Sequence, residues 1–61
     1  MEKLKQYLAQ NKATDLAARL GVTKGYIWQL KEGRAMPSLR RAVQIEDATN
    51  GAVPVRAWVD Q

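Results

Sequence analysis

The side chains of this sequence that could do chemistry are mainly cationic. Ten Lys and Arg residues stand against six Asp and Glu residues, and the chain contains no His and no Cys. It therefore lacks a cysteine nucleophile, a histidine general base and the usual ligands of a zinc site. Scattered carboxylates and a few hydroxyls are a weak basis for catalysis. We expect no enzyme, no metal site, no cofactor and no small-molecule substrate.

Positive charge is concentrated in the middle third of the chain. Residues 19–41 contain six basic residues and one acidic residue, a net charge of +5. Residues 42–61 contain one basic and three acidic residues, a net charge of −2. A local basic excess of this size is typical of proteins that bind a polyanion, either nucleic acid or an acidic membrane surface. A basic surface that faces only solvent has the same composition. The arrangement of the charges therefore has to distinguish such a surface from a binding surface.

Helices are expected to position these charges, because apolar residues recur at helical spacing and no alternating strand pattern is present. The spacing predicts helices over about 2–10, 13–20, 24–32 and 37–49. We expect Pro37 to occupy the first position of the fourth helix, where its missing N–H is not needed. The predicted fold is all-α, a single compact domain of four to five helices over residues 1–61.

The last stretch, residues 52–59, allows two conformations. Its valines are compatible with an edge strand or a β-hairpin, but Pro54 has no N–H to donate to a sheet. Alternatively, Pro54 begins a short helical turn that places Trp58 on the core. We expect the helical turn.

Two of the predicted helices are joined by Gly21-Val22-Thr23, in the order that a helix-turn-helix requires. Gly21 can adopt the positive φ of a helix end, and Thr23 can cap the helix that follows. Ala17 is small where the two helices cross, and Ile27 anchors the second helix to the first. The pattern predicts a helix-turn-helix over about 13–32, with helix 23–32 able to enter a DNA major groove. A plain helical hairpin without DNA binding is the alternative.

The segment LAARLGVTKGYIWQLKEG resembles the helix-turn-helix of the phage Cro and CI repressor superfamily. The segment IEDATNGAVPVRAWV resembles the small YdaS-like, Cro-type branch, so the likeness covers about residues 12–59. The resemblance implies a lambda-repressor-like fold and a prophage Cro-type transcriptional repressor, which binds a palindromic operator in double-stranded DNA as a homodimer. The chain departs from the family at Lys12-Ala13, where Ser or Thr followed by Gln is usual, and at Gly25 and Trp28. These departures leave the operator sequence open.

Two kinds of DNA contact are expected. Lys24 and Gln29 are the expected base readers, since Lys can donate to guanine and Gln can pair with adenine. The family pattern adds Gly25 and Trp28 to the groove-facing residues, although the Trp28 ring could instead fold onto the core or onto a partner subunit. Contacts to the DNA backbone are expected from a second group of residues: Lys12, Thr23, Lys31, Arg34, Arg40 and Arg41. For Thr23, capping of the helix is an alternative role.

The C-terminal region, about residues 37–59, is expected to serve dimerisation or closure of the core. The acidic balance of residues 42–61, a net charge of −2, argues against DNA contact there, and the candidate dimer residues are apolar: Val53, Val55, Trp58 and Val59. Pairing would double the DNA contacts, so we predict a homodimer, weak and formed mainly on DNA.

Several alternatives use the same sequence features. An antitoxin-like autoregulator needs the same motif, and a protein-interaction module could use the fold without DNA. A basic peptide on an anionic membrane is disfavoured, because the apolar stripes of the helices face a common core. No apolar stretch approaches the roughly 20 residues of a membrane-spanning helix, and the N-terminus lacks the apolar core of a signal peptide. We therefore expect a cytoplasmic, nucleoid-associated protein in a bacterial or phage-infected cell.

Overall fold

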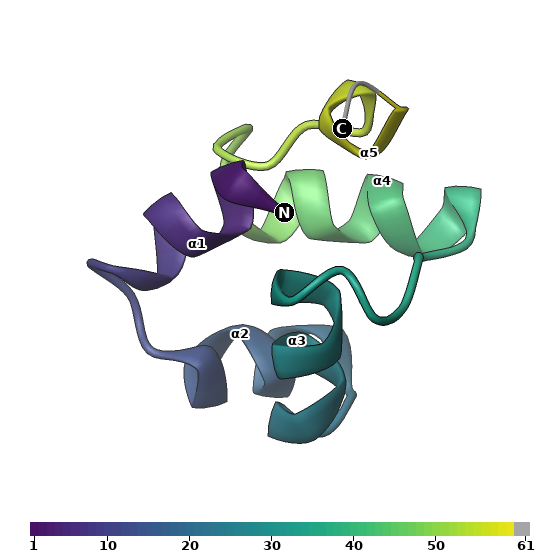
Figure 1. Cartoon of the computed structure of the whole chain (residues 1–61). Coiled ribbons are helices and arrows are strands. Elements are labelled where there is room, and N and C mark those ends of the chain that lie inside the picture. The colour runs from purple at the N-terminus through teal and green to yellow at the C-terminus, as the bar shows by residue number, and fades with distance from the viewer. Residues whose placement is uncertain (60–61) are drawn as a thin grey trace.

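A computed structural model describes residues 1–59, which form five helices and no strand. In chain order these are α1 (Glu2–Leu8), α2 (Ala13–Leu20), α3 (Lys24–Lys31), α4 (Leu39–Ala48) and α5 (Arg56–Val59). Helix α3 packs against α2 and α1, and α2 also packs against α4. Figure 1 shows α2 and α3 on one side of the molecule and α5 on the opposite side, beyond α4. The all-α prediction is confirmed, and the last stretch forms a helical turn instead of a hairpin.

Polar caps determine where the helices begin. The Thr23 hydroxyl accepts a hydrogen bond from the Tyr26 N–H at 3.0 Å, as expected for the cap of α3. At α4 the cap is Ser38, whose hydroxyl accepts from the Arg41 N–H at 3.1 Å. The prediction that Pro37 begins this helix is therefore wrong by two residues. A Ser hydroxyl satisfies an orphan N–H of the first turn, which a Pro side chain cannot do.

The start of α5 also differs from the prediction. Pro54 was expected at the first helical position, but the helix begins at Arg56. The carbonyl oxygen of Pro54 accepts a hydrogen bond from the Ala57 N–H at 3.0 Å, so Pro54 precedes the turn and supports it.

One apolar core lies between all five helices. Its buried residues come from every element and from the loop before α5: Leu4, Leu16, Ala17, Ile27, Leu30, Ala42, Ile45, Val53 and Trp58. Helix α4 contributes Ala42 and Ile45, whereas Leu39 and Val43 are 74% and 45% exposed. Leu39 and Val43 are apolar but lie on the surface of the helix outside the core.

Polar side chains at the end of α4 hold the loop that leads to α5. The hydroxyl of Thr49, which is buried, donates to the Ile45 carbonyl at 2.8 Å and accepts from the Val53 N–H at 3.1 Å. The Glu46 carboxylate accepts from the Val55 N–H at 2.8 Å. These bonds satisfy backbone groups that the loop between α4 and α5 would otherwise leave unpaired.

Candidate nucleic-acid interface

The turn between α2 and α3 holds α3 at the surface with one face free. Gly21 ends α2 with a φ of 71°, in the left-handed region that only Gly adopts without strain. The Val22 N–H then donates to the Ala17 carbonyl at 3.0 Å, which closes the turn. Ile27 and Leu30 are fully buried and attach α3 to the core. The opposite face of α3 is therefore directed to solvent.

That exposed face contains all four residues that the sequence analysis assigned to base contacts. Lys24, Gly25, Trp28 and Gln29 are each exposed. A side chain at Gly25 would meet only the Thr23 hydroxyl, with 3.8 Å between the added Cβ and the Thr23 Oγ1. Packing within the chain therefore does not require glycine here, although glycine weakens a helix. A missing side chain at this exposed position allows the backbone of α3 to approach a ligand closely.

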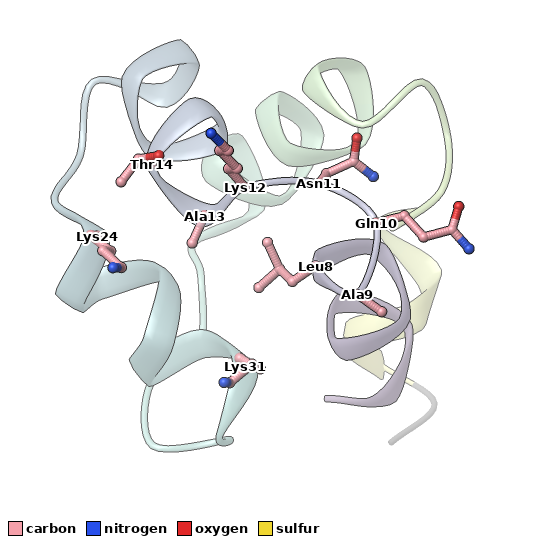
Figure 2. Close-up of a pocket in the computed structure, with 9 residues that line it drawn as sticks. All are labelled: Leu8, Ala9, Gln10, Asn11, Lys12, Ala13, Thr14, Lys24 and Lys31. Carbon is pink, nitrogen blue, oxygen red and sulfur yellow. The ribbon is translucent and has the colours of Figure 1, made fainter.

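A basic hollow lies along α3, whose first and last residues, Lys24 and Lys31, both line it. It is formed by the connection between α1 and α2 together with α3, and Figure 2 shows the side chains of Lys12, Lys24 and Lys31 around it. Lys12 stands at the N-cap of α2, and its carbonyl accepts from the Asp15 N–H at 3.1 Å, but its side chain makes no cap for the earlier N–H groups of the first turn. Three lysines that line a hollow together with the first two residues of α2 favour an anion such as phosphate. The opposing charge in that first turn is Asp15.

An arginine covers the exposed tryptophan at the other end of α3. The Arg34 Cζ lies 5.3 Å from the centre of the Trp28 ring, a cation–π contact. The backbone sets up this contact: Gly33 has a φ of 77°, and the Arg34 N–H donates to the Gln29 carbonyl at 2.8 Å. This helix ending turns the chain back along α3. Trp28 is 47% exposed, so its ring does not fold onto the core.

The remaining cationic candidates have different surroundings. Lys31 is partly exposed, and its Nζ lies 3.7 Å from a carboxylate oxygen of Glu32. Arg40 is exposed on α4. Arg41 is half-buried, and its Nη1 donates to the Leu20 carbonyl at 2.9 Å and to the Gln44 side-chain oxygen at 3.0 Å. The Arg41 guanidinium therefore links the end of α2 to α4 and has less freedom than Arg40 to reach a phosphate.

The structure also brings in residues that the sequence analysis did not single out. Asn11 and Thr14 line the basic hollow on either side of Lys12. Asn11 lies in the short connection before the helix-turn-helix, and Thr14 lies in the first turn of α2. Arg19 resembles Arg41 in its role, because its Nη1 donates to the Ala48 carbonyl at 2.9 Å and links α2 to the end of α4.

Three of the four candidate dimer residues line one apolar groove, and the fourth, Val53, lies in the core. Val53 is fully buried and cannot reach another chain, and Trp58 is 6% exposed. Val55 is half-buried, and Val59 is 78% exposed. Trp58 and these two valines line the groove together with residues from the connector before α4.

Comparison with known proteins gives one match. A family model described as Helix-turn-helix matches residues 3–54 of the 61-residue chain. No curated protein and no solved structure matches the chain. None of the helices over residues 1–59 combines the length and the apolar character that a membrane-spanning helix needs. In the same residues, no three side chains of the metal-ligating kinds His, Cys, Asp and Glu gather at one place.

Proposed function

The chain belongs to the Cro/CI-type helix-turn-helix family, and on this premise we propose that it is a transcriptional repressor of the prophage Cro type. Family membership supports a DNA-binding regulator. Repression, a palindromic operator and a homodimer are the further parts of the proposal, as is the YdaS-like branch suggested by residues 45–59. The observation that carries the proposal is the exposed face of α3, which presents Lys24, Gly25, Trp28 and Gln29 between a basic hollow and Arg34.

The dimensions of α3 suit a DNA major groove. An α-helix with its side chains is about 10–12 Å across, which fits a major groove about 12 Å wide. The N-terminal half of such a helix reads base edges. Lys24 lies at that end and can donate to guanine, while Gly25 lets the backbone come close. Gln29 lies on the same exposed face and can pair with adenine through its amide.

Cations on both sides of α3 supply contacts to the DNA backbone. Lys12 and Lys31 border the hollow beside α2, where a phosphate would meet the first turn of that helix. Arg34 follows the C-terminal end of α3, away from the half that reads bases. We therefore assign Arg34 to a phosphate and assign Trp28 to holding the Arg34 guanidinium in place. Arg40 is the exposed candidate on α4, and Thr23 and Arg41 act mainly through their bonds within the chain.

This function needs no catalytic group, cofactor or small-molecule substrate. A repressor acts where the chromosome lies, which for a prophage-type regulator is the cytoplasm of a bacterial or phage-infected cell. Its partners are double-stranded operator DNA and a second copy of the chain.

Matched lysine variants test the placement of the DNA. Each neutralised phosphate contributes about −0.9 to the slope of log affinity against log salt. Lys12→Ala is expected to reduce the magnitude of this slope by about 0.9. The control is Lys3→Ala, which removes the same charge from the exposed side of α1, away from the hollow, and should leave the slope unchanged. Equal effects of the two variants would show that only the net charge matters. Absence of binding to any duplex at low salt would refute the proposal as a whole.

A further inference from the structure

We propose that Asn50 is a site of spontaneous covalent modification. Its side-chain amide deamidates through attack by the Gly51 backbone nitrogen, and the folded turn after α4 holds this reaction back. The inference goes beyond the proposed function and does not depend on it, since it concerns the chemistry of one turn and needs no ligand. Three features carry it: the residue that follows Asn50, the hydrogen bonds of the turn and the backbone conformation of Asn50.

The reaction needs only an asparagine, the next backbone nitrogen and water. Asparagine is among the thermolabile residues of proteins for this reason. The Gly51 nitrogen loses its proton and forms a bond to the Asn50 Cγ, the bond between Cγ and Nδ2 breaks, and Nδ2 takes up a proton and leaves as ammonia. The product is a five-membered succinimide ring. Water then opens the ring, either at Cγ to give aspartate or at the main-chain carbonyl carbon to give isoaspartate.

Gly51 makes Asn50 the more reactive of the two asparagines in the sequence. Glycine has no Cβ, so no side chain obstructs the approach of the Gly51 nitrogen to the Asn50 Cγ. The other asparagine, Asn11, is followed by the bulky Lys12, and its Nδ2 donates to the Tyr7 carbonyl at 2.9 Å. Both asparagines are exposed, so Asn11 serves as an internal reference with the same amide and similar access to water.

The folded turn occupies the nitrogen that would attack. The Gly51 N–H donates to the Glu46 carbonyl at 2.9 Å, and the Asn50 N–H donates to the Asp47 carbonyl at 3.2 Å, the two bonds of a Schellman helix end. Loss of the Gly51 proton breaks the shorter of these bonds. Asn50 has a φ of 54° and is the one non-glycine residue among residues 1–59 with a positive φ. The turn therefore has to open before the reaction can proceed.

The buried side chain of Thr49 keeps the turn closed. Its hydroxyl donates to the Ile45 carbonyl at 2.8 Å and accepts from the Val53 N–H at 3.1 Å, so it links the two sides of the turn. A group that reacts only in a locally opened form reacts in proportion to the population of that form. The rate of deamidation at Asn50 in the folded chain therefore measures how often the end of α4 opens.

Modification makes such an opening permanent. Aspartate at position 50 adds a negative charge at the C-terminal end of α4, where the helix dipole disfavours anions and Glu46 and Asp47 are already present. Isoaspartate inserts a methylene group into the main chain and breaks the spacing of the turn's hydrogen bonds. Either product weakens the connection that holds Val53 and Trp58 on the core. Local opening is thereby converted into an irreversible loss of stability.

Mass spectrometry of tryptic peptides measures the reaction at both asparagines. Trypsin releases Asn50 in the peptide 42–56 and Asn11 in the peptide 6–12. The chain would be incubated at mildly alkaline pH, either folded or in guanidinium chloride above its unfolding midpoint. In denaturant, Asn50 should convert to aspartate and isoaspartate well before Asn11 reacts. In the folded chain, the rate at Asn50 should be at least about tenfold lower than in denaturant.

Two substitutions at Thr49 test the role of the turn. Thr49→Val removes the acceptor of the Val53 N–H and should raise the rate at Asn50 in the folded chain at least about fivefold. Thr49→Ser keeps the hydroxyl and should raise the rate less. In denaturant the three chains should react at similar rates, which separates opening of the turn from a direct effect of residue 49. Circular dichroism would verify that each variant folds, and the comparison of the original chain with and without denaturant stands without them.

Asn50→Gly is the control for the consequence of the reaction, because glycine accepts the positive φ and has no amide to lose. After incubation in denaturant and refolding, the original chain should have a lower Tm, whereas Asn50→Gly should keep its Tm. The inference is overturned if Asn50 and Asn11 deamidate at equal rates in denaturant, or if folding does not slow the reaction at Asn50. An equal fall of Tm in both chains would also contradict it, because damage elsewhere would then explain the loss.

Discussion

The contact between Trp28 and Arg34 leads to a quantitative prediction about how α3 binds DNA. The guanidinium carbon lies 5.3 Å from the ring centre, and the ring is about half exposed. A cation–π contact at such a site is worth about 0.5–1 kcal/mol. If the ring holds Arg34 in position for a phosphate, Trp28→Ala releases the side chain, and binding then has to order it again.

The expected loss follows from that energy. Trp28→Ala should weaken DNA binding about two- to fivefold, which corresponds to 0.5–1 kcal/mol, and by the same factor for every sequence. Arg34→Ala should remove the phosphate contact itself and reduce the magnitude of the salt slope by about 0.9. In the background of Arg34→Ala, the further change Trp28→Ala should cost little, because the group that the ring positions is already absent.

Fluorescence anisotropy with labelled duplexes provides the assay. The four proteins of the double-mutant cycle would be titrated at several salt concentrations against an operator-like and a scrambled duplex. Trp28→Phe is the control, since a smaller aromatic ring should retain most of the contact. The reasoning is refuted if the loss caused by Trp28→Ala persists in full without Arg34. A loss confined to one base pair of the site would also refute it, and would restore Trp28 as a base reader in contact with a thymine methyl group.

Three further predictions concern base reading, the buried hydroxyl and the turn. Gln29→Ala should reduce the difference in binding free energy between operator and random DNA by about 1–3 kcal/mol. Arg40→Ala should weaken binding to operator and random DNA by the same factor and lower the magnitude of the salt slope by about 0.9. Identical behaviour of the two variants in competition assays would contradict the assignment of Gln29 to bases and Arg40 to phosphates. Thr49→Val leaves the buried Val53 N–H without its acceptor. This change should lower the free energy of unfolding, measured in urea, by about 1–3 kcal/mol. A neutral substitution at an exposed position should change it by less than about 0.5 kcal/mol. In Gly21→Ala the added methyl group meets no atom within 4 Å. The substitution should therefore destabilise the fold only through the left-handed backbone conformation, by about 1–2 kcal/mol, and lower the Tm. An unchanged Tm would show that the turn does not need the left-handed conformation.

Local sequence signals predicted the helix-turn-helix well. Gly21 and Thr23 define the turn because each has a backbone role that few other residues can fill. Ile27 and Leu30 identified the buried face of α3 through their spacing. The exposed face follows from the buried one, so the residues proposed to read bases could be named before the structure was known.

Contacts between distant segments were beyond local signals. Periodicity marks Leu39 and Val43 as apolar but cannot tell which neighbour covers them, and the structure leaves both on the surface. The small core also includes Val53 and Trp58, because α1 to α4 are short and leave apolar surface for the tail to close; the position of Trp58 on the core was predicted, and the full burial of Val53 was not. The stacking of Arg34 on Trp28 depends on the way the chain turns at Gly33, and composition does not contain that information.

Selection of bound duplexes from a random DNA pool tests the central claim most directly. At about 150 mM salt, non-specific binding through phosphates is weak, so enrichment has to come from base contacts of α3. The account predicts an enriched inverted repeat with half-sites about one helical turn apart. A pool that stays random, despite detectable binding at low salt, would contradict it and leave the chain with a general affinity for polyanions.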